Sequence, residues 1–193
     1  MIHFMYEIEL KAHVDDWKAT EERLMSFARF VGRVQKDDAY WVIFKDGKKI
    51  QARIRRESDG TDGETKTFLT YKKKESRVDG GGTVYEVNDE KECTVSDAAV
   101  LESLFSDIGM KVDIRKQKKI TGFQAGEAHI ELCSVPPLGD FIEIEILSEK
   151  NDELTIAEKR VALIEILGRC GIPKDKIESR YYSEMLRERG LES

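Results

Sequence analysis

The chain has 193 residues, 36% of them charged, and carries a net charge of −6 at neutral pH. This length is enough for one domain with a real core, which we predict over residues 1–193. The acidic net charge argues against a general nucleic-acid-binding protein. The sequence shows neither a signal peptide nor an apolar run near the ~20 residues of a membrane span. We therefore expect a cytoplasmic protein without nucleic-acid or membrane partners.

The first predicted elements are a strand and a helix. Residues 6–12 alternate between polar and apolar side chains, which is the period of a half-buried strand. Asp15 or Asp16 can cap the helix that follows, in which apolar side chains recur at helical spacing. We expect this helix to extend to about Phe30 and to end at Gly32.

A hairpin is predicted next. Residues 34–44 are expected to be extended, with a break at Asp37 and Asp38. An Asp-Gly turn at residues 46–47 then leads into a returning strand over residues 50–56, because Asp-Gly pairs favour the tight turns that join antiparallel strands.

The remaining elements follow from the same periodicities. Strands are expected at about residues 65–74, 83–95, 111–121, 127–134 and 139–147, and helices at about 97–109, 154–171 and 181–186. The glycine tract 80–82 is interpreted as a hairpin rather than a phosphate-binding loop, because neither a Lys-Ser/Thr pair nor a helix follows it. About eight strands joined mostly by hairpins favour an antiparallel sheet, and charges along one face favour its closure into a barrel.

Cysteine and histidine give no sign of a disulfide framework or a zinc site. Cys93, Cys133 and Cys170 are odd in number and far apart, so we expect reduced thiols. The three histidines form no metal-binding pair or triad. Carboxylates would therefore hold any divalent ion, which favours magnesium or manganese.

Five predicted strands carry charged residues at every second position, and so on one face of each strand. These residues are Glu7, Glu9 and Lys11; Arg53 and Arg55; Lys72 and Lys74; Lys116 and Lys118; and Glu143 and Glu145. An ion taken out of water costs several kcal/mol, so such charges must pair, stay hydrated or bind a ligand. Cations and carboxylates in one cavity would suit a metal-bound polyphosphate.

These charged motifs recur in an order that resembles the CYTH superfamily, also called the triphosphate tunnel metalloenzymes. Residues 7–11 match its Glu-x-Glu-x-Lys signature, and residues 138–145 match its Leu-Gly-x-Phe-x-Glu-x-Glu strand. Between them, residues 38–40 resemble an Asp-x-Tyr strand, residues 52–55 an Arg-x-Arg strand, and residues 116–118 a Lys-x-Arg strand. The resemblance covers nearly the whole chain.

The resemblance implies an α+β fold in which an eight-stranded antiparallel barrel forms a triphosphate tunnel, with helices packed outside. It assigns catalytic roles to Lys11, Glu9, Arg53 and Arg55. The triphosphate would be bound by Lys11, Arg53, Arg55, Lys72, Lys116 and Lys118, and Mg²⁺ or Mn²⁺ by Glu7, Glu9, Glu143, Glu145 and Glu131. Glu90 and Glu92 are expected in a second shell or on the surface.

Two departures from the family pattern keep their charge. Lys118 stands where arginine is usual, and Glu131 where many members have aspartate. Lysine loses the planar two-pronged grip of arginine on phosphate but stays cationic. The C-terminal segment 179–186 is similar to a Ser-Tyr-x-x-Leu-Leu tail of cyclase-like members.

Three functions are open. The resemblance favours a class IV adenylyl cyclase-like enzyme that converts ATP to cyclic AMP and pyrophosphate. The alternatives are a hydrolase of inorganic or thiamine triphosphate, and a nucleotide- or polyphosphate-binding module without turnover. ATP or another triphosphate is thus the expected partner, and a homodimer is left open.

Overall fold

The computed structural model describes residues 6–59, 65–78, 84–150 and 152–190, with side chains for all of these except 72–78 and 84–90. The strands are β1 (Tyr6–His13), β2 (Arg29–Lys45), β3 (Lys48–Asp59), β4 (Thr65–Val78), β5 (Val84–Val95), β6 (Lys111–Ala125), β7 (Ala128–Val135) and β8 (Gly139–Ser148). The helices are α1 (Trp17–Phe27), α2 (Ala98–Asp107), α3 (Glu153–Arg169) and α4 (Tyr182–Glu188), with a 3₁₀ turn, η1, at Lys174–Lys176.

The strands confirm the predicted α+β class. Their hydrogen-bonded order is β1-β5-β4-β3-β2-β6-β7-β8, and β8 pairs back with β1, which is the pairing pattern of a closed antiparallel barrel. The chain divides into two compact units: Met1–Arg33, Lys73–Asp89 and Ile120–Ser179 form unit 1, and Val34–Lys72, Glu90–Lys119 and Arg180–Ser193 form unit 2. The expectation of one domain over residues 1–193 stays a prediction.

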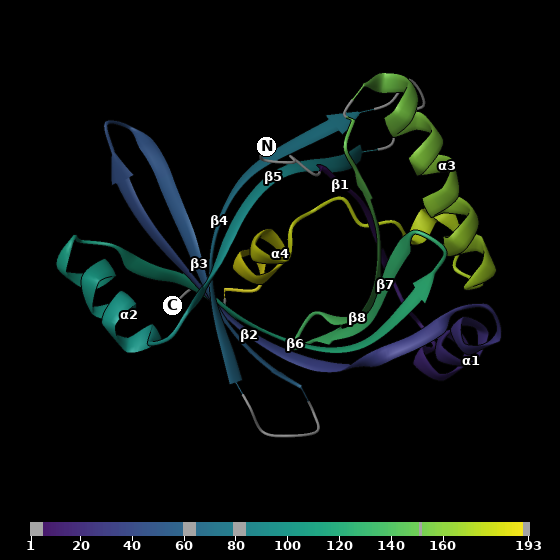
Figure 1. Cartoon of the computed structure of the whole chain (residues 1–193), viewed down its shortest axis with the longest axis horizontal. Helices are drawn as coiled ribbons and strands as arrows, with labels where there is room; N and C mark the ends of the chain where they lie inside the picture. Colours follow the sequence, from purple (N-terminus) through teal and green to yellow (C-terminus); the bar gives the residue numbers. More distant parts are fainter. Residues whose placement is uncertain (1–5, 60–64, 79–83, 151, 191–193) are drawn as a thin grey trace. The chain divides into compact units, whose positions relative to one another are not determined.

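Unit 1 has the larger apolar core. On the face of β1, β7 and β8 that packs against helices, residues such as Ile8, Ile130 and Ile144 are fully buried. Helix α3 packs on β8 and β1 (Figure 1). It adds Leu163 and Leu167 to the same core. One face of these three strands is therefore apolar and covered, which leaves the other face for the alternating charges.

Unit 2 is built around the β2–β3 hairpin. Ala39, Trp41 and Ile54 are buried, and Phe105 of α2 packs edge-on against Trp41. The predicted Asp-Gly turn is present, with Lys45 opposite Lys48. Asp46 and Gly47 have φ angles of 52° and 72°, the left-handed conformation that tight hairpin turns need and that these residue types tolerate.

Two predictions for residues 17–45 are wrong. Helix α1 ends at Phe27 rather than near Phe30, and β2 begins at Arg29, ahead of Gly32. Strand β2 also passes through Asp37 and Asp38 without a break. Tertiary pairing explains the second error, because Asp38 is buried against cations of two other strands.

The N-terminal caps of two helices and the state of the cysteines can be compared with the sequence-based expectations. Asp16 and Asp97 cap α1 and α2 by accepting hydrogen bonds from backbone amides of the first turn. Cys93, Cys133 and Cys170 form no disulfide in the described part of the chain. Within the described residues, no helix is long and apolar enough to cross a membrane. The glycine tract 80–82 lies outside the described residues.

Candidate functional site

The charged face of unit 1 carries two rows of polar residues across β1, β8 and β7. In one row Glu9 lies opposite Glu145, which lies opposite His129. In the next row Lys11 lies opposite Glu143, which lies opposite Glu131. We call these six residues the carboxylate rows. Residues directly opposite each other on neighbouring strands have Cβ atoms about 5 Å apart, so Glu9 and the pair Glu143 and Glu145 belong to one patch. Glu7 lies opposite Leu147, outside these rows.

The carboxylate rows suit a hard divalent ion in their chemistry, since carboxylate oxygens are what Mg²⁺ and Mn²⁺ prefer. Their side chains do not converge into a ready coordination shell: among the described residues, no group of three or more His, Cys, Asp or Glu is placed to hold a metal ion. His129 Nε2 lies 3.7 Å from Glu131 Oε1, so the histidine faces its own strand neighbour. Metal binding by Glu7, Glu9, Glu131, Glu143 and Glu145 stays a prediction.

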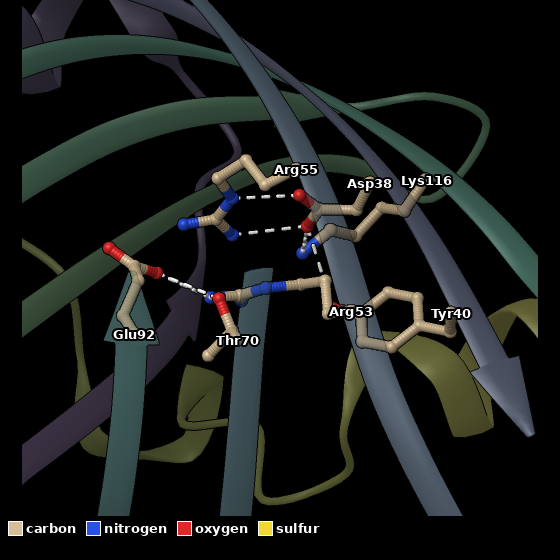
Figure 2. A network of polar contacts seen from close by, with 7 residues as sticks. All are labelled: Asp38, Tyr40, Arg53, Arg55, Thr70, Glu92 and Lys116. Carbon is tan, nitrogen blue, oxygen red and sulfur yellow. Dashed lines mark hydrogen bonds and ion pairs between the residues drawn. The ribbon is translucent and has the colours of Figure 1, made fainter. Parts of the chain in front are cut away.

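Unit 2 holds a cation cluster, which we define as Arg53, Arg55, Lys116 and Lys118 (Figure 2 shows the first three). At its centre lies Asp38, only 3% exposed. Arg55 donates to both carboxylate oxygens of Asp38, from Nε at 2.7 Å and from Nη2 at 3.0 Å. Lys116 Nζ lies 3.0 Å from the same carboxylate (Figure 2). A single buried anion therefore orients two cations from β3 and β6.

Arg53 belongs to a second chain of contacts in unit 2 (Figure 2). Its Nη2 donates to Thr70 Oγ1 at 3.0 Å, and the Thr70 hydroxyl donates to Glu92 Oε2 at 2.7 Å. Glu92 Oε2 also lies 3.5 Å from Arg53 Nη2. Glu92 thus contacts a predicted phosphate-binding arginine.

The electrostatics of Asp38 and Tyr40 follow from these neighbours. Burial raises the pKa of the Asp38 carboxyl, but the charges of Lys116 and Arg55 outweigh burial and hold this pKa far below its usual range. Burial likewise raises the pKa of the Tyr40 phenol, and Lys116 with Arg53 and Arg55 brings it below its ordinary value. Both shifts indicate a strongly positive local potential in unit 2.

Lys116 and Lys118 occupy the buried face of β6, 7% and 4% exposed, whereas Arg115 and Lys119 point to solvent. The ring of Tyr182, from α4, lies 5.0 Å from Lys116 Nζ and 6.0 Å from Lys118 Nζ. Helix α4 thus places an aromatic ring beside two buried cations of β6.

The predicted site residues fall into two sets. All five predicted metal ligands and Lys11 belong to unit 1, and the other predicted phosphate-binding residues belong to unit 2. The side chains of Lys72 and Glu90 lie outside the described residues. The predicted list omitted Asp38, Thr70 and Tyr182. A signal for Asp38 existed, since the Asp-Gly turn places it opposite Arg55.

Comparisons with known proteins concern the family and the fold of the chain. The family model described as CYTH domain matches residues 5–182, which spans both units and every predicted site residue. A search of curated proteins gives no match.

Solved structures share the fold. The PH1819 protein of Pyrococcus horikoshii OT3 is 26% identical, with a TM-score of 0.77 over 95% of this chain and 99% of its own. A Vibrio parahaemolyticus protein described as a candidate adenylate cyclase is 18% identical, with a TM-score of 0.68 over 94% and 98%. A Hippeastrum protein described as a candidate adenylyl cyclase with a dominant triphosphatase activity is 14% identical, with a TM-score of 0.57 over 96% of each chain. At these two lower identities the likeness concerns the fold alone.

Proposed function

We propose, from the premise that this chain belongs to the CYTH family, that it is a metal-dependent enzyme acting on a triphosphate, with the conversion of ATP to cyclic AMP and pyrophosphate as its leading reaction. The observation that carries the proposal is the cation cluster. Four cationic side chains gather in unit 2, and two of them, Arg55 and Lys116, are oriented by a buried carboxylate. Oriented cations are what a polyphosphate needs, because phosphoryl and nucleotidyl transfer depend on positioning and charge neutralisation.

The residues of the cation cluster would bind phosphate oxygens by charge-assisted hydrogen bonds. Asp38 takes two N–H donors of Arg55 and so fixes the plane of its guanidinium. Thr70 and Glu92 both contact Nη2 of Arg53 and hold that end of its guanidinium. Because these side chains are held before the ligand arrives, less conformational entropy is lost on binding.

Glu7, Glu9, Glu131, Glu143 and Glu145 are the residues that would hold the metal, and proteins of this family generally depend on a divalent metal. Bound Mg²⁺ or Mn²⁺ would supply charge neutralisation and a lowered pKa for the attacking hydroxyl or water. Lys11, 8% exposed and opposite Glu143, combines a cation with the carboxylate rows. We assign it, with Glu9, Arg53 and Arg55, to the catalytic set.

In the leading reaction the ribose 3′ oxygen attacks the α-phosphorus of ATP. The bond from that phosphorus to the oxygen bridging the α and β phosphates breaks, pyrophosphate leaves, and the 3′ proton passes to solvent. The alternative, hydrolysis of inorganic or thiamine triphosphate, uses the same cations with water as the nucleophile. We retain this alternative because the Hippeastrum protein, which shares the fold, has a dominant triphosphatase activity.

Product analysis tests the proposal. The protein is incubated with Mg²⁺ or Mn²⁺ and either ATP, inorganic triphosphate or thiamine triphosphate, and cyclic AMP, pyrophosphate and phosphate are resolved by chromatography. Cyclic AMP and pyrophosphate in equal amounts support the cyclase. Phosphate released from a triphosphate without cyclic AMP assigns the hydrolase. Binding without any product reduces the protein to a binding module.

A further inference from the structure

Two lysines of the cation cluster share one aromatic ring. Lys116 Nζ lies 5.0 Å, and Lys118 Nζ 6.0 Å, from the centroid of Tyr182. Both lysines are buried, and Tyr182 is only 8% exposed. The face of an aromatic ring is electronegative and attracts cations within about 6 Å, more strongly where water is excluded. The ring thus offers a common negative surface to two like charges on one face of one strand.

Helix α4 is fastened so that this ring stays in place. At its start, Glu184 Oε2 accepts a hydrogen bond from the Tyr181 amide at 2.8 Å. Along its length Met185 and Leu186 are buried. At its end Arg187 Nη2 donates to Asp113 of β6. The same strand therefore carries both lysines and the carboxylate that holds the helix.

Lys116 and Lys118 differ in their other neighbours. Lys116 also contacts the Asp38 carboxylate at 3.0 Å and lies 5.8 Å from the ring centroid of Tyr40. The ring of Tyr182 lies near both ammonium ions, with its centroid 5.0 Å from Lys116 Nζ and 6.0 Å from Lys118 Nζ. It is consequently placed to set their spacing, which a bound oxyanion would have to match.

We propose that Tyr182 is a positioning residue of the phosphate site, whose aromatic face holds Lys116 and Lys118 at the spacing that a polyphosphate requires. The inference rests on the proposed function and extends it to a residue of α4. Lysine side chains have many rotamers, and each one immobilised on binding costs affinity. A ring that restrains both ammonium ions beforehand removes that cost without touching the reacting atoms.

Two substitutions separate this role from simple packing. Tyr182→Phe keeps the aromatic face and loses only the hydroxyl, whereas Tyr182→Leu stays apolar and loses the face. A packing role depends on volume and predicts that binding follows thermal stability in both variants. A positioning role predicts that Phe behaves as wild type and that Leu binds oxyanions weakly even when fully folded. Glu188→Gln is the matched control, since it removes only an exposed ion pair of α4 with Arg180.

Binding is measured by isothermal titration calorimetry on the full chain without divalent metal, so that no turnover occurs, with inorganic triphosphate and with sulfate as probes. We expect Tyr182→Leu to weaken triphosphate binding about tenfold, because both lysines lose the restraint of the ring. Tyr182→Phe and Glu188→Gln should stay within about twofold of wild type. With Mg²⁺ present, Tyr182→Leu should raise KM for the triphosphate and change kcat little.

A second variant tests the fastening of α4. Arg187→Gln breaks the contact with Asp113 and leaves Tyr182 intact, and we expect it to weaken triphosphate binding in the same direction as Tyr182→Leu, by a smaller factor. Unchanged binding in Tyr182→Leu, or equal losses in the Phe and Leu variants, overturns the positioning role alone. If wild type binds sulfate but not triphosphate, the proposed function fails, while the Phe and Leu variants still decide the role of Tyr182 on sulfate. If wild type binds neither anion, both fail.

Discussion

Asp38 shows how one buried residue can organise a site whose other members are all cations. Its carboxylate accepts hydrogen bonds from Nε and Nη2 of Arg55 and forms an ion pair with Nζ of Lys116. Removing one partner of a buried ion pair is costly because the remaining charges stay buried without compensation. The charge of Asp38 is therefore needed for the fold of unit 2 as well as for the geometry of the cations.

The first prediction concerns this charge. Asp38→Asn should lower the free energy of unfolding by about 3–5 kcal/mol, measured by urea denaturation at neutral pH. Asp37→Asn is the control, because Asp37 contacts Gln35 and its loss should cost about 1 kcal/mol or less. Equal losses in the two variants would show that the ion pairs of Asp38 contribute little.

The pH dependence of this effect has a definite sign. The pKa of Asp38 is depressed in the folded protein, so its contribution to stability is present above the unfolded pKa of about 3.9 and is lost as pH falls below it. We expect the difference between wild type and Asp38→Asn to be constant from about pH 5 to 8 and to shrink below about pH 4. A difference that shrinks between pH 5 and 7 would contradict the assignment.

A further prediction at the scale of residues concerns the carboxylate rows. Glu9→Gln keeps the shape of the side chain and loses its charge, so Mg²⁺-dependent turnover of the triphosphate should fall more than about a hundredfold, since loss of partners around metal ligands alone costs 10–100-fold. Glu127→Gln is the control, because Glu127 pairs with Lys159 at the exposed surface. Wild-type rates in Glu9→Gln at limiting metal would falsify the metal assignment, provided that circular dichroism shows both variants folded.

At the scale of elements, the hairpin shows how far the sequence can lead. A two-residue Asp-Gly turn fixes the register of both strands, because Lys45 pairs with Lys48 and every pair outward follows by counting. Counting outward puts Asp38 opposite Arg55 and Tyr40 opposite Arg53, as the structure has them. This contact could have been predicted once the turn was accepted.

Other features of the elements could not be predicted from local patterns. Two adjacent aspartates usually favour a loop, yet β2 continues through them because Asp38 is paired by Arg55 of β3 and by Lys116 of β6, a strand that lies far along the chain. The end of α1 at Phe27 could not be predicted from local patterns either, because the following residues 29–31 belong to the long strand β2. Tyr182 was likewise visible only as part of a tail motif, because its neighbours Lys116 and Lys118 precede it by more than sixty residues.

The prediction at this scale concerns helix α3. Leu167→Ala should lower the free energy of unfolding by about 2–5 kcal/mol, because Leu167 is fully buried against the sheet of unit 1 and the substitution leaves a cavity. Val161→Ala in the same helix is the control, since Val161 is mostly exposed and should change stability by less than about 0.5 kcal/mol. A small loss at both positions, measured by urea denaturation, would mean that α3 contributes little to the core.

At the scale of the whole molecule, the charges expected of a metal-triphosphate site are divided between the two units. The carboxylate rows, which include Lys11, belong to unit 1, and the cation cluster belongs to unit 2. The sequence shows which strands carry paired charges, because alternation is a local pattern, and the fold shows which of them are neighbours within a unit. A polyphosphate bound by the cation cluster should therefore raise the stability of the folded chain, because it binds only the folded state.

The last prediction concerns which phosphate compounds stabilise the folded chain. A ligand at about a hundred times its dissociation constant adds roughly 2.7 kcal/mol to the free energy of unfolding, which for a chain of this size raises the melting temperature by about 5–10 °C. In a thermal-shift series with Mg²⁺ and equal concentrations of phosphate, pyrophosphate, ADP, inorganic triphosphate and ATP, we expect the two triphosphates to give the largest shifts. The reason is charge: the four cations of the cluster can each make a charge-assisted contact worth about 1.5–3 kcal/mol, and a triphosphate carries more negative charge to place against them than a diphosphate does. Sodium sulfate at matched ionic strength controls for screening. Equal shifts for all five compounds would contradict a triphosphate site, and a shift for inorganic triphosphate without one for ATP would move the enzyme from cyclase to triphosphatase.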